Sequence, residues 1–243
     1  MSGERTHEAK EVVRERVWKL LEQRNAAPNG ASGRIPSFVG ADSAAVRLSG
    51  HPTWQRASVI KAVPDRAQLP VRARALEEGK RVYMAASKLA TPKPFYLLDP
   101  ETLTVPPHEA AERRTAAKHA KPVDLTEMPH VDFIVCGSVA VNPQGVRLGK
   151  GAGYSDIEMA LLQEANLIDS RTLIATTVHE LQIVDEPLPE AGHDFRVDLI
   201  VTAERVIECA PYRRPSGIIW PSLEEAKIAA IPALASRRPS TGE

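Results

Sequence analysis

Residues 131–162 read VDFIVCGSVAVNPQGVRLGKGAGYSDIEMALL, and this stretch decides the fold. It begins with an apolar, β-branched run over residues 131–135, which predicts a buried strand. A turn signal at residues 142–145 and a glycine-rich segment at residues 147–154 follow it. Apolar residues at spacings of three and four from Ile157 onward then predict a helix. Strand, glycine-rich loop and helix is the order in which α/β proteins build phosphate-binding sites.

The glycine-rich segment has the chemistry of an anion site. Small residues let the backbone approach an anion, backbone N–H groups point toward it, and the N-terminus of the next helix adds partial positive charge. Arg147 and Lys150 add two full charges, and Asp156 is placed to hold a magnesium ion on the same phosphates. The alternative is a tight turn before an amphipathic helix, because the G-x-G-x-G spacing matches neither the P-loop nor the G-x-G-x-x-G fingerprint.

The rest of the chain alternates between strand and helix patterns. Apolar runs predict strands at residues 57–63, 82–86, 95–98, 171–178 and 197–202, with residues 206–209 extending or pairing with the last of them. Amphipathic patterns and breakers predict helices at residues 8–24, 42–50, 71–79, 108–118 and 223–230. We expect residues 1–7 to fray and residues 179–183 to be extended. The alternation predicts a three-layer α/β/α, Rossmann-like fold with a mostly parallel sheet, whose ligands lie at the carboxyl ends of the strands.

Composition limits the class of protein. The 243 residues contain 43% hydrophobic and 26% charged residues, as in ordinary globular proteins. We expect one α/β domain over residues 1–210 and a tail, residues 211–243, with one short helix and a disordered end of about eight residues. Acidic and basic residues balance at 31 each, so no global charge favours a nucleic-acid or membrane partner. Cys136 and Cys209 stand in or beside apolar runs and are expected to be free, buried thiols, although a disulfide stays possible.

No apolar run approaches the length of a membrane span, and the polar N-terminus lacks a signal-peptide core. We therefore expect a cytoplasmic protein. The sequence does not distinguish a monomer from a homodimer.

Three stretches carry recognisable spacings. Residues 147–156 read RLGKGAGYSD, residues 193–202 read HDFRVDLIVT, and Lys10 and Arg14 stand four residues apart in the N-terminal helix. Together they resemble the R-[LI]-G-x-G-x-G-Y-Y-D, H-D-x-x-x-D-x-[IV]-[IV]-T and K-x-x-x-R patterns of the 5-formyltetrahydrofolate cyclo-ligases, also called methenyltetrahydrofolate synthetases. Phrases at residues 33–36, 131–135 and 137–141 are similar to the methenyltetrahydrofolate synthetase domain-containing subgroup.

The resemblance implies an ATP- and magnesium-dependent ligase of one-carbon metabolism. In the family, the formyl oxygen of 5-formyltetrahydrofolate is phosphorylated, N10 attacks the formyl carbon, and phosphate leaves as the 5,10-methenyl ring closes. Such chemistry needs positioning and charge neutralisation more than covalent help from the protein. The expected partner is therefore a small molecule, either a folate or another N-formyl compound. The nucleic-acid-binding extension of some subgroup members is not expected, because the chain stops early and has no aromatic RNP-like strand.

The resemblance also implies roles for individual residues. The implied nucleotide-binding set is Lys10, Arg14, Arg147, Gly149, Lys150, Gly151, Ala152, Gly153, Tyr154 and Asp156. Within it, Arg147, Lys150 and Tyr154 take the catalytic positions. Asp156 and Asp194 take the magnesium positions. Ser138, Lys88 and His193 are the candidates for substrate binding.

The chain departs from the family pattern mainly on the substrate side. Ser155 stands where the family has a second tyrosine, and residues 136–138 replace a usual proline. No acidic residue occurs over residues 68–74, where the family carries a glutamate that helps to fix the formyl group. Two further hypotheses therefore stay open. One is a non-catalytic nucleotide-binding protein, and the other is a related ATP-dependent enzyme for a different substrate in specialised metabolism.

Overall fold

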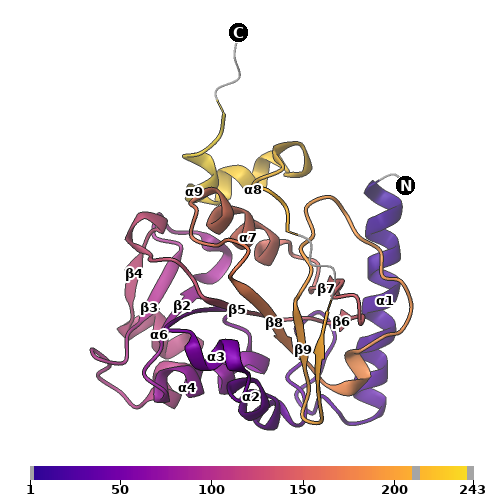
Figure 1. Ribbon diagram of the computed structural model, residues 1–243. Helices are drawn as coiled ribbons and strands as arrows, with labels where there is room; N and C mark the ends of the chain where they lie inside the picture. The colour runs from indigo at the N-terminus through magenta and orange to yellow at the C-terminus, as the bar shows by residue number, and fades with distance from the viewer. Residues whose placement is uncertain (1–2, 210–213, 240–243) are drawn as a thin grey trace.

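The computed structural model describes residues 3–209 and 214–239, and an eight-stranded sheet forms its centre (Figure 1). The strand order is β10-β9-β8-β5-β1-β2-β3-β4. The strands are β1 (Val59–Ala62), β2 (Arg81–Ala85), β3 (Phe95–Leu98), β4 (Lys121–Val123), β5 (Phe133–Cys136), β8 (Leu173–Thr177), β9 (Leu199–Val201) and β10 (Val206–Glu208). Strands β9, β8, β5, β1 and β2 are parallel, whereas β3, β4 and β10 add antiparallel edges. The predicted mostly parallel sheet is confirmed.

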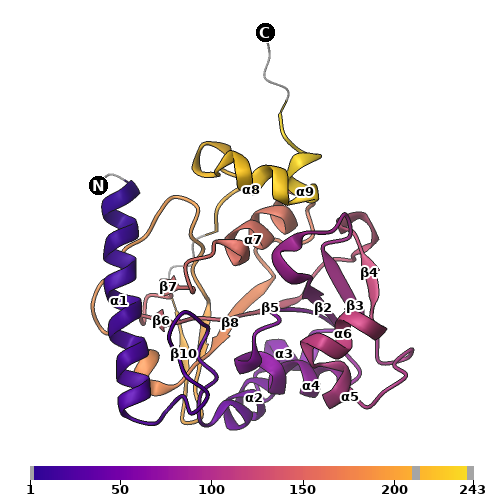
Figure 2. The same cartoon turned by 180° about the vertical axis from the view of Figure 1, so that it is seen from behind.

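Helices cover both faces of this sheet, which makes the three layers (Figures 1 and 2). One face carries α2 (Ala41–Ser49), α3 (Pro52–Arg56), α4 (Leu69–Glu77), α5 (Pro107–Ala110) and α6 (Arg113–His119). The other face carries α7 (Tyr154–Glu164), α8 (Glu225–Ala230) and α9 (Pro232–Ala235). Each face of the sheet has its own hydrophobic core. Because side chains alternate along a strand, Ile60 and Phe133 pack into the core under α2–α6, whereas Val59 and Ile134 pack into the core under α7–α9.

Helix α1 (Gly3–Gln23) stands beside the sheet, next to the two-stranded ribbon of β6 (Ala140–Val141) and β7 (Arg147–Leu148) (Figures 1 and 2). Val17 and Leu21 are buried in a third core, which they share with Phe38 and Leu148. This packing fixes the helix against the segment that leads into the glycine-rich loop. The predicted fraying of residues 1–7 is wrong for residues 3–7, since the helix already begins at Gly3.

Two other local predictions need correction. Residues 180–182 form the 3₁₀-helix η4 (Glu180–Gln182) and are not extended. The reason is a capping box, in which His179 Nδ1 accepts from the Leu181 N–H at 3.1 Å and the Gln182 side chain accepts from the His179 N–H at 2.8 Å. The helix predicted at residues 108–118 is divided into α5 and α6, because Glu112 between them has an extended backbone.

The C-terminal segment packs onto the sheet domain through α8 and α9. Ile228, Ile231 and Leu234 are buried in the same core as Leu161 of α7. The predicted short helix is present as α8, and α9 was not predicted. Of the predicted disordered end, residues 240–243 lie outside the described residues. Among the helices of residues 3–209 and 214–239, none is both long enough and apolar enough to cross a membrane.

Candidate active site

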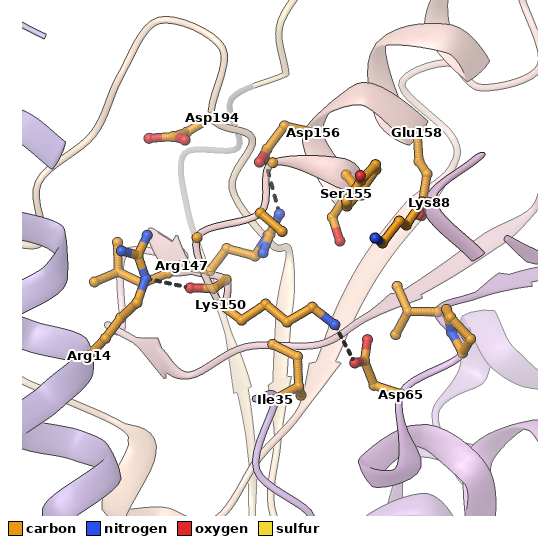
Figure 3. Close-up of a pocket in the computed structure, with 18 of the residues that line it drawn as sticks. Arg14, Ile35, Asp65, Lys88, Arg147, Lys150, Ser155, Asp156, Glu158 and Asp194 are labelled. Atoms are coloured by element: carbon orange, nitrogen blue, oxygen red, sulfur yellow. Dashed lines mark hydrogen bonds and ion pairs between the residues drawn. The ribbon is translucent and has the colours of Figure 1, made fainter. Parts of the chain in front are cut away.

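A cavity of about 450 Å³ opens where the parallel strands end, between α1, the glycine-rich loop and the start of α7 (Figure 3). Residues 63–65 line it directly after β1, and residues 86–88 line it directly after β2. Six lysine and arginine side chains and four carboxylates face it: Lys10, Arg14, Lys88, Arg113, Arg147, Lys150, Asp65, Asp156, Glu158 and Asp194. The excess of positive charge suits a polyphosphate. The position matches the expected ligand site at the carboxyl ends of the strands.

The glycine-rich loop has a backbone that only glycine adopts easily. Gly151 and Gly153 have φ values of 96° and 71°, in the left-handed region, and Gly153 is the N-cap of α7. Arg14 Nε donates to the Gly149 carbonyl at 2.7 Å, so α1 holds the loop from outside. Residues 149–154 all line the cavity, and the implied nucleotide-binding loop therefore lies at its wall.

Arg147 is a buried centre of this wall. Its guanidinium lies 4.0 Å from the centroid of the Phe195 ring and donates to Asp156 Oδ1 at 3.1 Å and to the Gly137 carbonyl at 3.3 Å. Within the described residues its Nε, also buried, has no partner. With two contacts and a stacked ring already in place, the guanidinium orients Asp156 and adds positive charge to the cavity.

Asp156 and Asp194 line the same cavity, and each carboxylate is paired with a cation. Burial raises the pKa of Asp156, and while Arg147 opposes this shift, the negative charge of Asp194 adds to it. Asp194 itself pairs with Lys10 at 2.5 Å and accepts from the Ala191 N–H at 2.6 Å, and His193 Nε2 lies 3.7 Å from its other oxygen. The structure thus brings Lys10, from the N-terminal helix, next to the second aspartate.

These two aspartates bear on the expected magnesium ion. Among the described residues, no group of three or more His, Cys, Asp or Glu side chains is arranged to hold a metal. Magnesium keeps several waters and is commonly held by one or two carboxylates together with substrate phosphates. The pair therefore fits an ion that arrives with a polyphosphate, and it does not form a complete cage.

Lys150 faces a carboxylate that sequence analysis overlooked. Its Nζ lies 3.0 Å from Asp65 Oδ1 across the cavity (Figure 3). Asp65 follows β1, and the buried Arg72 shapes this turn by donating to the Val63 and Asp65 carbonyls. Burial lowers the pKa of Arg72 to about 10, although the charge of Asp65 opposes the shift. The Pro64–Asp65 pair at the end of an apolar run was the available signal.

A second overlooked pair connects β1 to α7. Lys61 donates to Glu158 Oε2, and both side chains are buried. Glu158 lines the cavity one helical turn after Tyr154. The only signal for Lys61 was its position as the single charged residue in an otherwise apolar strand.

The predicted substrate residues are distributed unevenly. Lys88 and His193 line the cavity, and Lys88 adopts a left-handed backbone with φ 56°. Ser138 does not line it: its hydroxyl is buried 2.8 Å from Thr176 Oγ1. Ser138 is thus misplaced as a substrate ligand, because the chain after β5 turns its side chain into the sheet. Ser155, which departs from the family pattern, does line the cavity.

Helix α8 supplies a further contact that the sequence did not reveal. Lys227 Nζ donates to the Ala152 carbonyl at 2.7 Å and lies 5.3 Å from the centroid of the Tyr154 ring. Tyr154 is therefore positioned between the cavity and the C-terminal segment. A smaller cavity of about 220 Å³ continues from the loop toward residues 217–234.

Comparisons with known proteins agree with the motifs. The chain matches the 5-formyltetrahydrofolate cyclo-ligase family over residues 6–203. The methenyltetrahydrofolate synthase domain-containing proteins of Bos taurus and Danio rerio are 34% identical to it over 237 and 239 residues, covering 95% of this chain and 62% of each relative. The Homo sapiens protein of the same name is 32% identical over 236 residues, covering 95% of this chain and 61% of its own. The chain thus spans about three fifths of the length of these relatives.

The NMR structure of Aquifex aeolicus 5,10-methenyltetrahydrofolate synthetase shares the fold, with a TM-score of 0.53 and 21% identity, over 90% of this chain and 96% of that one. The predicted resemblance is confirmed, including its subgroup. The chain belongs to the 5-formyltetrahydrofolate cyclo-ligase family.

Proposed function

We propose that this protein is an ATP- and magnesium-dependent cyclo-ligase that activates an N-formyl group, with 5-formyltetrahydrofolate as the first substrate to test. The observation that carries the proposal is the meeting of Lys10, Arg14 and Lys150 around one glycine-rich loop. These three cations come from two distant parts of the sequence. Membership of the family adds the reaction type to this arrangement.

In the proposed reaction the formyl oxygen attacks the γ-phosphorus of ATP, and the bond between that phosphorus and the β,γ-bridging oxygen breaks to release ADP. The resulting imidate phosphate carries an electrophilic carbon. N10 attacks this carbon, the C–O bond breaks to release inorganic phosphate, and the N10 proton passes to that phosphate. The products are the 5,10-methenyl compound, ADP and phosphate, so atoms and charge balance.

The residues of the cavity supply positioning and charge. Lys150 and the N–H groups of the loop hold the transferred phosphoryl group, and Lys10 and Arg14 close over the nucleotide from α1. Asp156 and Asp194 would hold a magnesium ion, which would supply charge neutralisation for the phosphates. Arg147 keeps Asp156 in place through its 3.1 Å hydrogen bond.

The test is an assay with 5-formyltetrahydrofolate, ATP and magnesium that follows methenyl absorbance and phosphate release together. We expect both signals at equal rates, and neither when ATP is omitted. Failure to form a methenyl product while ATP binds would reject the cyclo-ligase reaction on this substrate.

A second candidate is a related ATP-dependent enzyme that acts on a different N-formyl compound. Gln68 favours it, because this side chain is fully buried and donates to Thr177 Oγ1 at 3.1 Å instead of lining the cavity. The segment that would fix the formyl group in the family therefore presents no carboxylate here. Phosphate release with another N-formyl compound, and none with 5-formyltetrahydrofolate, would select this candidate.

A further inference from the structure

Lys61 and Glu158 form a buried ion pair beside the cavity. Its carboxylate member, Glu158, lines the end of the cavity away from Asp194 (Figure 3). Lys61 belongs to the central strand β1, and its side chain is 1% exposed. Glu158 belongs to α7, and its side chain is 5% exposed. Neither residue takes part in the phosphate chemistry proposed above.

Fold stability does not explain such a pair. Removing two charges from water is costly, and replacing a buried ion pair by well-packed apolar residues is often neutral or stabilising. The positions around Lys61 are already apolar, with Val59 and Val63 in the same core. An apolar pair would complete that core, so we look for a role of the two charges other than fold stability.

The geometry points to a ligand for the carboxylate. Glu158 lines the cavity, whereas Lys61 lies behind it. Lys61 occupies Oε2, and none of the hydrogen bonds within the described residues reaches Oε1. Lys61 therefore holds Glu158 in a fixed orientation, with one oxygen left to accept from the cavity.

We propose that Glu158 is a substrate-binding residue that accepts hydrogen bonds from an amidine-type edge, a ring N–H beside an exocyclic amino group, and that Lys61 is its positioning residue. This inference rests on the proposed function, since the pyrimidine ring of 5-formyltetrahydrofolate presents such an edge. Because a carboxylate oxygen has two lone pairs, Oε1 can accept from both adjacent N–H donors while Oε2 keeps its bond to Lys61. The edge binds at the Glu158 end, and the formyl group faces the glycine loop.

The neighbouring charges agree with this orientation. Tyr154 and Glu158 are four residues apart on α7 and so share one face of the helix. Lys88 and Arg113 line the same cavity and add positive charge to it. The cavity thus has both an acceptor for N–H groups and cations.

The experiment measures binding of 5-formyltetrahydrofolate by calorimetry in the presence of ADP and magnesium. We expect Glu158→Gln to weaken binding about 10- to 100-fold, the range for one lost charged hydrogen bond. Binding of ADP alone is expected to stay unchanged. The matched control is Glu164→Gln on the same helix, where the carboxylate caps the Ile218 N–H outside the large cavity.

A second variant guards against misfolding, because Glu158→Gln leaves Lys61 buried without its partner. The double variant Lys61→Met/Glu158→Leu removes both charges and is expected to fold, to bind ADP and to lose folate affinity. An analogue of 5-formyltetrahydrofolate that carries methyl in place of the 2-amino group completes a double-mutant cycle between ligand and protein. The wild type is expected to bind it about 10-fold more weakly than the parent compound, and Glu158→Gln is expected not to distinguish the two.

The outcomes separate the inference from the proposed function. Binding without turnover, with loss of affinity in Glu158→Gln, keeps the inference and rejects the reaction. Turnover with equal affinities in the wild type and Glu158→Gln keeps the reaction and overturns the inference. A wild type that binds no 5-formyltetrahydrofolate overturns the inference, since the proposed ligand edge is then not recognised.

Discussion

At the scale of single residues, the cations of the site differ in how freely they can meet a phosphate. The Lys150 side chain is 41% exposed, whereas Lys10 is 10% exposed and Arg147 is 3% exposed. Lys150 can therefore exchange Asp65 for a phosphate oxygen with little rearrangement. Arg147 is held by Phe195 and Asp156, so we expect it to fix the geometry of the site.

This difference predicts separate effects for two substitutions. Lys150→Ala is expected to weaken ATP affinity about 10-fold, because one charged contact to phosphate is lost. Calorimetric titration with ATP and magnesium measures it, with the exposed Lys118→Ala as the control. An unchanged dissociation constant would remove Lys150 from the nucleotide site.

Arg147→Lys keeps the charge but removes the planar group that stacks on Phe195. A lysine ammonium cannot stack there and also reach Asp156 and the Gly137 carbonyl in the same geometry. We expect kcat of the methenyl-forming reaction to fall at least about 10-fold, corresponding to about 1.4 kcal/mol of barrier. Wild-type kcat in this variant would show that charge suffices at this position.

At the scale of elements, three helices control the glycine-rich loop and the cavity beside it. Helix α1 holds the loop through Arg14 and Gly149, and α7 begins at its last glycine. Helix α8 contacts it from the other side, through Lys227 and the Ala152 carbonyl. The loop is thus clamped by segments from both ends of the described chain.

The α8 contact predicts a selective effect on the loop. Lys227→Met is expected to weaken ATP binding about three- to 10-fold, since a loop that is less fixed pays more ordering entropy on binding. The free energy of unfolding is expected to change by less than about 1 kcal/mol, as for a partly buried hydrogen bond. Glu225→Gln, on the same helix but paired with Arg238 at the surface, is the control. Equal ATP affinity in Lys227→Met and the control would contradict a role for α8.

The ion pair of Lys61 and Glu158, which connects β1 to α7, predicts an effect on stability. Lys61→Met leaves the Glu158 carboxylate buried without its cation and is expected to lower the free energy of unfolding by about 3–5 kcal/mol. Lys61→Met/Glu158→Leu is expected to recover most of this loss, because no buried charge remains. Urea denaturation of the two variants measures the difference, and equal stabilities would show that the pair is not coupled.

At the scale of the whole molecule, both cysteines are free thiols, as predicted, in two different environments. Cys136 ends the central strand β5 and is fully buried, and its pKa is raised by burial. Cys209 is half-buried, and burial together with the negative charge of Asp198 raises its pKa to about 11. The fold therefore holds both sulfurs in the unreactive thiol form.

This protection predicts slow alkylation. At pH 8, three units below its pKa, Cys209 is a thiolate in only about one molecule in a thousand, so native labelling by iodoacetamide is expected to be slow. The rate is expected to rise about 10-fold per pH unit up to that pKa, because only the thiolate reacts. Cys136 is expected to react only after global unfolding in urea. Fast labelling of Cys209 in the native protein at pH 8 would contradict its raised pKa.

Sequence patterns predict the elements whose stabilisation is local or strictly periodic. The strand β5, the glycine loop and α7 follow from residues 131–162, because apolar spacing and left-handed glycines act over a few residues. The predictions fail where contacts outside the apolar pattern decide the backbone conformation. The 3₁₀-helix at residues 180–182 depends on a capping box and on Gln182 donating to the Ser138 carbonyl at 2.8 Å.

The amino-acid sequence by itself determined the family, the mostly parallel sheet and the glycine loop with its charged neighbours, since each is written in short-range spacing. Only the tertiary structure decided which charges meet. Lys10 pairs with Asp194 across 184 positions, and Lys61 pairs with Glu158 across 97. Such partners are brought together by the packing of α1, β1 and α7, and no local pattern records that distance. The proposed nucleotide-binding residues were therefore readable from motifs, whereas the proposed substrate-binding residues were identified only from the fold.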